Sequence, residues 1–227
     1  MIRFNRTAMI NTMAGDNGGQ LLTVDISAAL HPYLREPLSE AQLANIATYI
    51  RLLKKWNQTI PLTSIEDQTE IVARHFGESL FAATPLPMEH GRLADVGTGA
   101  GFPGLALKIV APELQLVLVE PNIKKCAFLR EAQAALRFTG VEVIRKRYED
   151  FAAEPHSFDF ICSRALGHYK QLLQWAKPAL KNSGHVLLWL GVDDSNSITR
   201  IKGWHWGLPE KIPESRRRVI LIGRPII

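Results

Sequence analysis

The sequence predicts an α/β fold in which helices cover both faces of a mostly parallel sheet. Short apolar runs alternate with helix-forming segments between residues 91 and 190, a pattern typical of consecutive strand–helix–strand units. Residues 93–104 pass from an apolar run through four glycines and a proline toward a helix. Two further apolar runs, at residues 204–206 and 218–222, follow the last of these units and favour a C-terminal antiparallel hairpin.

The main part of the chain is expected to contain five parallel strands, each followed by polar or glycine residues. We place these strands at residues 93–96, 114–119, 141–144, 158–162 and 186–190, and the intervening helices at 104–110, 123–138 and around 171–175. Residues 193–203 are polar and lead into the hairpin.

The first 90 residues are interpreted as a loose leader followed by a helical extension. Residues 1–37 carry scattered glycines and prolines and are expected to be a loose leader. Ser39 and Gln42 form a capping box, and apolar residues at helical spacing then predict a helix that ends near Asn57. A second capping box at residues 67–70 starts another helix. The predicted units are therefore the leader (1–37), the extension with its linker (38–90) and the main domain (91–227).

Composition limits the class of protein. The 227 residues suffice for one full α/β domain with an extension. No apolar run approaches the roughly 20 residues that a membrane-spanning helix needs. Cys126 and Cys162 lie far apart and lack metal-ligand spacing, so we expect a cytoplasmic protein without a metal site. The net charge of +5 is compatible with an anionic partner.

The glycine stretch predicts a turn that binds a cofactor. Glycines at this density let the backbone turn sharply and approach a ligand that a Cβ would exclude. Pro103 suits the first turn of the following helix, whose unpaired N–H groups face the loop. We therefore expect Gly97, Gly99 and Gly101 to contact a nucleotide-like ligand at the carboxyl edge of the sheet.

Polar residues at the ends of parallel strands share one edge of the sheet. Glu120, Tyr148, Glu149 and Arg164 follow the second, third and fourth predicted strands, so we expect them around one crevice. Glu120 suits the ribose hydroxyls of a bound nucleotide, because a carboxylate accepts hydroxyl protons and repels a phosphate.

Two cofactors compete for this crevice. Residues 99–104 match G-x-G-x-x-G, the pattern of NAD sites. The fuller pattern, with Asp95 at the strand end and glycines at positions 97, 99 and 101, is typical of S-adenosyl-L-methionine sites. The chain also lacks the second half-fold and the substrate domain that a dehydrogenase usually has. The sequence therefore favours a methyltransferase.

The residues after the fourth strand bear on the atom that is methylated. Ser163 and Arg164 stand where exocyclic-amine methyltransferases carry an Asn/Asp-Pro-Pro-aromatic tetrad. A cysteine nucleophile such as Cys162 would serve methylation of a base carbon, but a buried strand residue is the simpler interpretation. A purine N7 has a free lone pair and needs no general base. Catalysis at N7 reduces to positioning and electrostatics, in agreement with these residues.

The motifs together resemble the bacterial small-subunit ribosomal RNA methyltransferase G family (RsmG/GidB), over residues 39–224. The matching motifs are Lys55-Trp56-Asn57, Leu62-Thr63-Ser64, Val72-Ala73-Arg74-His75, residues 95–104, Phe128-Leu129-Arg130 and Ser163-Arg164-Ala165. The glycine motif with its Phe-Pro-Gly ending is quite specific to that family. The resemblance implies a Rossmann-like class I S-adenosylmethionine-dependent methyltransferase with a seven-stranded sheet. It also implies N7 methylation of a guanine in 16S ribosomal RNA.

The resemblance also implies roles for individual residues. The cofactor contacts would be Gly97, Phe102, Tyr148, Glu149 and Arg164. The glycine-loop argument adds Gly99 and Gly101 to them, and the strand-end argument adds Glu120. The catalytic candidates are Arg164, Lys124 and Lys125. The resemblance makes Arg74 and His75 RNA-binding candidates, and the basic face of the helix before Asn57 adds Arg51, Lys54 and Lys55. The alternative for His75 is a structural role. The alternative for the cations of residues 51–55 is that they only form the solvated face of their helix. The expected partner is 16S ribosomal RNA or the small ribosomal subunit, bound by a monomer.

Two positions depart from the family pattern. Pro61 stands where the family usually has asparagine, and Leu190 stands before Gly191 where it usually has lysine. A lysine there could serve RNA or the developing charge, and leucine can do neither, so target choice and rate are in question. Two alternatives stay open: a diverged member that keeps the fold as an RNA-binding module with altered or lost activity, or a methyltransferase for a small molecule.

Overall fold

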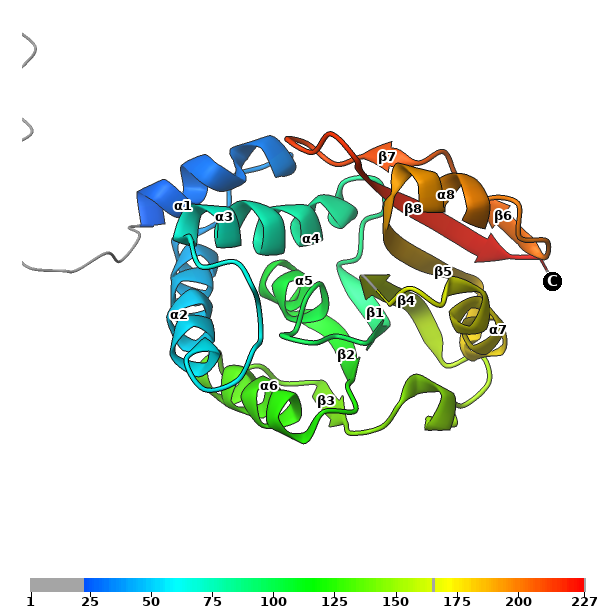
Figure 1. Ribbon diagram of the computed structural model, residues 1–227, viewed down its shortest axis with the longest axis horizontal. Helices are drawn as coiled ribbons and strands as arrows, with labels where there is room; N and C mark the ends of the chain where they lie inside the picture. Colours follow the sequence, from blue (N-terminus) through cyan, green and yellow to red (C-terminus); the bar gives the residue numbers. More distant parts are fainter. Residues whose placement is uncertain (1–22, 165, 227) are drawn as a thin grey trace, which may run out of the picture.

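The computed structural model describes residues 23–164 and 166–226, and a single mixed sheet lies at its centre (Figure 1). Neighbouring strands follow the order β3-β2-β1-β4-β5-β8-β6, and β7 pairs with β8 outside this path. The strands are β1 (His90–Val96), β2 (Glu113–Val119), β3 (Val141–Ile144), β4 (Phe158–Arg164), β5 (Leu180–Gly191), β6 (Trp204–Trp206), β7 (Glu210–Lys211) and β8 (Arg218–Pro225). The seven strands on the path confirm the predicted fold, and the unpredicted β7 adds an eighth.

The first five strands are parallel, and β1 lies between β2 and β4. Strand β8 runs antiparallel to both β5 and β6, so the predicted C-terminal antiparallel pair is confirmed. Strand β5 starts earlier than predicted, at Leu180. The carboxyl ends of β1, β2, β4 and β5 therefore lie along one edge, as the sequence predicted.

Successive strand residues alternate between two hydrophobic cores, one on each face of the sheet. On β2, Leu116 and Leu118 belong to the core that contains residues of α5 (Gly104–Val110) and α6 (Ile123–Ala135). Val117 and Val119 belong to the core that contains residues of α7 (Tyr169–Ala179) and α8 (Val192–Ile198). Such apolar strands are typical of a parallel sheet buried on both faces. Helix α8 occupies part of the polar stretch for which no helix was predicted.

The helical extension packs on the face that carries α5 and α6 (Figure 1). Helix α2 (Glu40–Asn57) begins at the predicted capping box, in which the Gln42 N–H donates to Ser39 Oγ at 3.3 Å and the Ser39 N–H donates to Gln42 Oε1 at 2.8 Å. The extension shares one core with the sheet, and the division of the chain near residue 90 stays a prediction. No helix among the described residues is long and apolar enough to cross a membrane.

The prediction of a loose leader is wrong for residues 23–33. Helix α1 (Thr23–Leu30) and a 3₁₀ turn (His31–Tyr33) place Ile26, Leu30 and Tyr33 in the core of the extension. Ile26 and Leu30 are one helical turn apart, a short signal that the surrounding glycines and prolines concealed. The remainder of the predicted leader, residues 1–22, lies outside the described residues.

The second predicted helix consists of several helical segments in succession. These are α3 (Gln68–Ile71), a π-helical segment (Val72–Gly77), α4 (Glu78–Leu80) and a 3₁₀ turn (Phe81–Ala83). At its start Asp67 Oδ1 accepts from the Glu70 N–H at 2.7 Å. The second half of the expected capping box is replaced by a bond from Arg74 to Glu70. π-helical segments occur frequently at functional sites, and this one carries Arg74 and His75.

Candidate active site

Asp95, near the end of the interior strand β1, holds the glycine loop in place. Its carboxylate is buried, and Oδ2 accepts hydrogen bonds from Thr98 Oγ1 at 2.6 Å and from the Gly104 N–H at 2.8 Å. These two donors lie near the start and at the end of the loop, so one oxygen fixes both parts. Burial raises the pKa of Asp95 to about 6, and the two hydrogen bonds act in the opposite direction.

Three glycines of the loop have positive φ angles, which are +70° at Gly97, +59° at Gly99 and +84° at Gly101. A Cβ on Gly101 would meet Tyr49 Oη and lie 2.6 Å from Leu105 Cδ1, so packing requires glycine there. A Cβ on Gly99 would meet only the Gly97 carbonyl oxygen, at 4.0 Å, besides its chain neighbours. The space beside Gly99 is therefore open to a ligand.

Glu120 connects the glycine loop to the end of β2. Its side chain is largely buried, Oε2 accepts from the Gly99 N–H at 3.0 Å, and Oε1 accepts from the Asn122 N–H at 2.9 Å. Each carboxylate oxygen keeps a second lone pair that can accept a ligand hydroxyl. The structure thus brings Glu120 and Gly99 together at the predicted crevice.

Tyr148 and Glu149 lie on a 3₁₀ turn (Tyr148–Asp150) that follows β3. The Tyr148 ring packs edge-on against Trp175, with centroids 6.0 Å apart. Its hydroxyl is buried and has no hydrogen-bond partner within the described part of the chain. Burial, and then the negative charge of Glu149 next to it, raises the pKa of Tyr148 to about 12, so the hydroxyl remains a donor at neutral pH. A buried unpaired donor marks a place where a ligand acceptor can bind. Glu149 is exposed beside it, and its role stays a prediction.

Arg164 and His75, both predicted site residues, are in direct contact. From the end of β4, Arg164 donates from Nη1 to the Arg74 carbonyl oxygen at 2.9 Å and from Nη2 to His75 Nδ1 at 2.8 Å. Because arginine only donates, Nδ1 is an acceptor, and the hydrogen of the neutral ring lies on Nε2. Nε2–H donates to Thr63 Oγ1 at 2.8 Å. Burial, and then the charge of Arg164, lowers the pKa of His75 to about 3. His75 is therefore neutral, and both its ring nitrogens are engaged.

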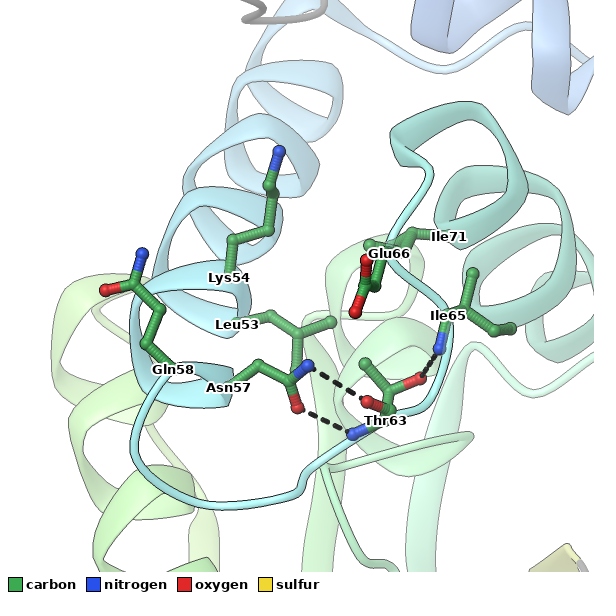
Figure 2. Close-up of a pocket in the computed structure, with 8 residues that line it drawn as sticks. All are labelled: Leu53, Lys54, Asn57, Gln58, Thr63, Ile65, Glu66 and Ile71. Carbon is green, nitrogen blue, oxygen red and sulfur yellow. Dashed lines mark hydrogen bonds between the residues drawn. The ribbon is translucent and has the colours of Figure 1, made fainter.

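Asn57, at the end of α2, fixes the loop that carries Thr63 (Figure 2). Asn57 Oδ1 accepts from the Leu62 and Thr63 N–H groups at 2.8 and 2.9 Å, and Nδ2 donates to the Thr63 carbonyl oxygen at 2.9 Å. Four sequence motifs thus form one hydrogen-bonded series, Asn57–Thr63–His75–Arg164, which we call the Asn57–Arg164 chain. Pro61 is exposed and contributes no hydrogen bond to it.

A cavity of about 390 Å³ lies between α2 and this loop. Figure 2 shows Lys54 on the α2 side and Glu66 on the loop side, with Leu53, Ile65 and Ile71 as apolar lining. The Asn57 side-chain amide lies in the wall of this cavity, and its hydrogen bonds go to Leu62 and Thr63 of the loop. This cavity therefore brings one predicted RNA-binding residue, Lys54, near the Asn57–Arg164 chain.

Phe102 is enclosed by protein. Its ring stacks on His75, with centroids 4.7 Å apart, and on Tyr49, with centroids 5.3 Å apart. The guanidinium carbon of Arg164 lies 5.6 Å from the centre of the same ring. Phe102 therefore joins the glycine loop to the Asn57–Arg164 chain, and its predicted contact with the cofactor stays a prediction.

A second cavity, of about 360 Å³, lies at the carboxyl ends of β4 and β5. The charged residues that line it are Arg74, Glu78, Arg164, Asp194 and Arg218. We call it the arginine cavity, because its three arginines outnumber its two acids. Leu190 is buried in its wall, and Ile65 lines both cavities.

Glu78 is a site candidate that sequence reasoning missed. It is 2 % exposed, and its Oε1 lies 2.6 Å from Arg218 Nη2. Its carbonyl oxygen accepts from Trp189 Nε1 at 2.7 Å. Burial raises the pKa of Glu78, and the charge of Arg218 opposes the rise. The one signal in the sequence is that Glu78 follows Arg74 by four residues within a helical pattern.

The other predicted cations lie on helix surfaces. Arg51, Lys54 and Lys55 are exposed on α2, and Lys55 Nζ lies 3.9 Å from Glu131 Oε1 on α6. Lys124 and Lys125 lie in the first turn of α6 and do not line the arginine cavity. Their catalytic and RNA-binding roles stay predictions. Within residues 23–164 and 166–226, no group of three His, Cys, Asp or Glu residues could hold a metal ion.

The Asn57–Arg164 chain predicts a specific loss of stability. Thr63→Val removes the acceptor of the His75 Nε2–H and of the Ile65 N–H, and should lower the free energy of unfolding by about 2 kcal/mol. Thr63→Ser keeps the hydroxyl and should lose less than half as much. Urea unfolding of both variants measures the difference, and equal losses would show that the hydroxyl is not what matters.

His75 predicts a pH dependence of stability. Its pKa is about 3 in the folded protein against 6.5 ordinarily, so only the unfolded chain binds this proton between these values. Its stabilising contribution is therefore complete above pH 6.5 and is lost as the pH falls toward 3, with a slope of up to about 1.4 kcal/mol per pH unit. Urea unfolding of the wild type and His75→Gln between pH 7.5 and 4.5 isolates this slope. Parallel profiles for the two proteins would contradict it.

The chain matches known proteins along most of its length. The family model described as rRNA small subunit methyltransferase G matches residues 42–202. A ribosomal RNA small subunit methyltransferase G from Desulfitobacterium hafniense (strain Y51) is 39% identical over 168 residues, which cover 73% of this chain and 70% of the relative. The protein of the same name from Xanthomonas axonopodis pv. citri (strain 306) is 37% identical over 207 residues, covering 88% and 96%.

A solved structure supports the fold. A SAM dependent methyltransferase from Aquifex aeolicus aligns with a TM-score of 0.60 at 14% identity, covering 73% of this chain and 97% of that protein. At this identity the likeness concerns the fold alone, which is the Rossmann-like methyltransferase fold predicted from the sequence. The family match spans the glycine loop, the Asn57–Arg164 chain and most of the arginine cavity. The chain therefore belongs to the rRNA small subunit methyltransferase G family.

Proposed function

We propose that this protein transfers a methyl group from S-adenosylmethionine to N7 of a guanine in 16S ribosomal RNA. One observation carries the proposal: the open glycine loop and the arginine cavity lie at the same edge of the sheet, and Arg164 contacts both. A nucleotide-type cofactor site beside a positively charged cavity is what a nucleic-acid methyltransferase requires. The names of the curated relatives support the same activity.

The residues around the glycine loop fit the cofactor. The open space at Gly99 allows close approach, Glu120 keeps lone pairs for ribose hydroxyls, and Tyr148 offers an unpaired donor. When bound, S-adenosylmethionine supplies a methyl group on a positively charged sulfonium, which a nitrogen lone pair accepts without loss of a proton. The protein then needs to orient the acceptor rather than to deprotonate it.

The acceptor side agrees with N7 chemistry. His75 cannot act as a base, because both ring nitrogens are engaged and its pKa is about 3. Arg74, Arg164 and Arg218 supply positive charge for RNA phosphates or for guanine O6. Arg164 is held by His75, so its position relative to the glycine loop is fixed before RNA binds.

The partner and the compartment follow from the same proposal. A net charge of +5 and the relatives' names favour 16S ribosomal RNA, alone or within the small subunit, as the substrate. Such a substrate places the protein in the cytoplasm, where we expect it to act as a monomer.

Gly99→Ala tests the cofactor site. The variant adds a Cβ in the space that the cofactor approaches, and it should weaken binding of S-adenosylhomocysteine about tenfold or more, or ~1.4 kcal/mol. Gly203→Ala is the matched control, because Gly203 also has a positive φ, +88°, but precedes β6 at the opposite edge of the sheet. Both variants should lose similar stability. Titration calorimetry that finds the same affinity in both would contradict the site.

The proposed reaction is tested with labelled S-adenosylmethionine and small ribosomal subunits from a strain that lacks the family enzyme. We expect label in 7-methylguanosine at one position, mapped by mass spectrometry, with Gly203→Ala active and Gly99→Ala about tenfold or more less active at limiting cofactor concentration. No label despite intact cofactor binding would contradict the proposal and favour a diverged member, with Leu190 as the first position to revert. Label on another atom would contradict the N7 assignment alone.

A further inference from the structure

The arginine cavity contains one buried carboxylate among its arginines. Glu78 is 2 % exposed and lines the cavity beside Arg74, Arg164 and Arg218. A cavity that bound only phosphate groups would gain nothing from a negative charge at this place, since the charge would repel the ligand. The carboxylate therefore needs an explanation beyond general affinity for RNA.

This carboxylate has a single partner. Its Oε1 lies 2.6 Å from Arg218 Nη2, and no other residue of the described part of the chain pairs with the Glu78 side chain. A carboxylate accepts up to about four hydrogen bonds, so lone pairs remain available to a ligand in the cavity.

The group is also held firmly in place. The backbone carbonyl of Glu78 accepts the Trp189 indole N–H at 2.7 Å, which ties the residue to β5. Arg218 ties the side chain to the start of β8. Trp189 itself lines the cavity, so an aromatic ring lies next to the acceptor group, and aromatic rings stack on nucleobases.

Guanine matches this arrangement. Its Watson–Crick edge presents N1–H and the N2 amino group as donors, whereas adenine presents an unprotonated N1 that a carboxylate would repel. The N7 atom lies on the opposite, Hoogsteen side and stays free when the Watson–Crick edge is bound. Guanine O6 is an acceptor that an arginine can contact.

We infer that Glu78 selects guanine in the arginine cavity by accepting hydrogen bonds from N1–H and the N2 amino group, which leaves N7 exposed for methylation. The inference rests on the proposed function and adds to it the residue that chooses the base. The competing explanation is that Glu78 only holds Arg218 at the edge of the sheet.

The test compares acceptor RNAs that carry guanine or inosine at the methylated position, since inosine keeps N7, O6 and N1–H but lacks the N2 amino group. For the wild type, kcat/KM with guanine should exceed that with inosine by roughly 10- to 100-fold, the effect of losing a hydrogen bond to a charged acceptor. For Glu78→Gln, activity on guanine should fall and the guanine-to-inosine ratio should drop to within about threefold of one.

Asp194→Asn is the matched control, because Asp194 is the other acid of the cavity, and it should keep the wild-type ratio. A purely structural Glu78 would lower activity on both RNAs equally and leave the ratio unchanged, which would overturn the inference. A guanine-to-inosine ratio of kcat/KM that falls toward one in Asp194→Asn, and not in Glu78→Gln, would also overturn the inference.

The wild-type measurement stands even where Glu78→Gln does not fold. A wild type that methylates both RNAs equally well refutes base selection through the N2 amino group. If neither RNA is methylated, the proposed function itself fails. The two failures are therefore distinguishable.

Discussion

A single buried oxygen, Asp95 Oδ2, determines the shape of the glycine loop. It accepts from Thr98 Oγ1 and from the Gly104 N–H, and so fixes where the loop leaves β1 and where α5 begins. Burial of this carboxylate is unfavourable, as its raised pKa shows, and the two hydrogen bonds offset part of that cost. Because Asp95 fixes the loop, the space beside Gly99 stays open and the Gly99 N–H donates to Glu120.

The helical extension does more than cover one face of the sheet. Through the Asn57–Arg164 chain, the end of α2 orders a loop, the loop orients His75, and His75 holds Arg164 at the end of β4. The stacking of His75 on Phe102 joins this series to the glycine loop. The extension therefore contributes to the geometry of the cofactor site, and it supplies Arg74, His75 and Glu78 to the lining of the arginine cavity.

Local patterns made much of this architecture predictable. The capping box at Ser39 and Gln42 and the glycine loop are set by neighbouring residues, and their predicted positions are confirmed. The Glu78–Arg218 ion pair could not be predicted, because it depends on how β8 returns beside β5. The π-helical segment was equally hidden, because apolar spacing does not reveal which carbonyl each N–H contacts. Helix α1 was missed because only two of its residues, Ile26 and Leu30, form the apolar pattern that would have predicted it.

Hydrogen exchange measured by mass spectrometry, with and without S-adenosylhomocysteine, tests the central claim that the glycine loop binds the cofactor. The account predicts slower exchange at residues 97–104, at the β2–α6 junction around Glu120 and at the turn that carries Tyr148. Slower exchange confined to the cavity between α2 and the loop of Thr63 would contradict it, because the cofactor would then occupy the extension rather than the edge of the sheet.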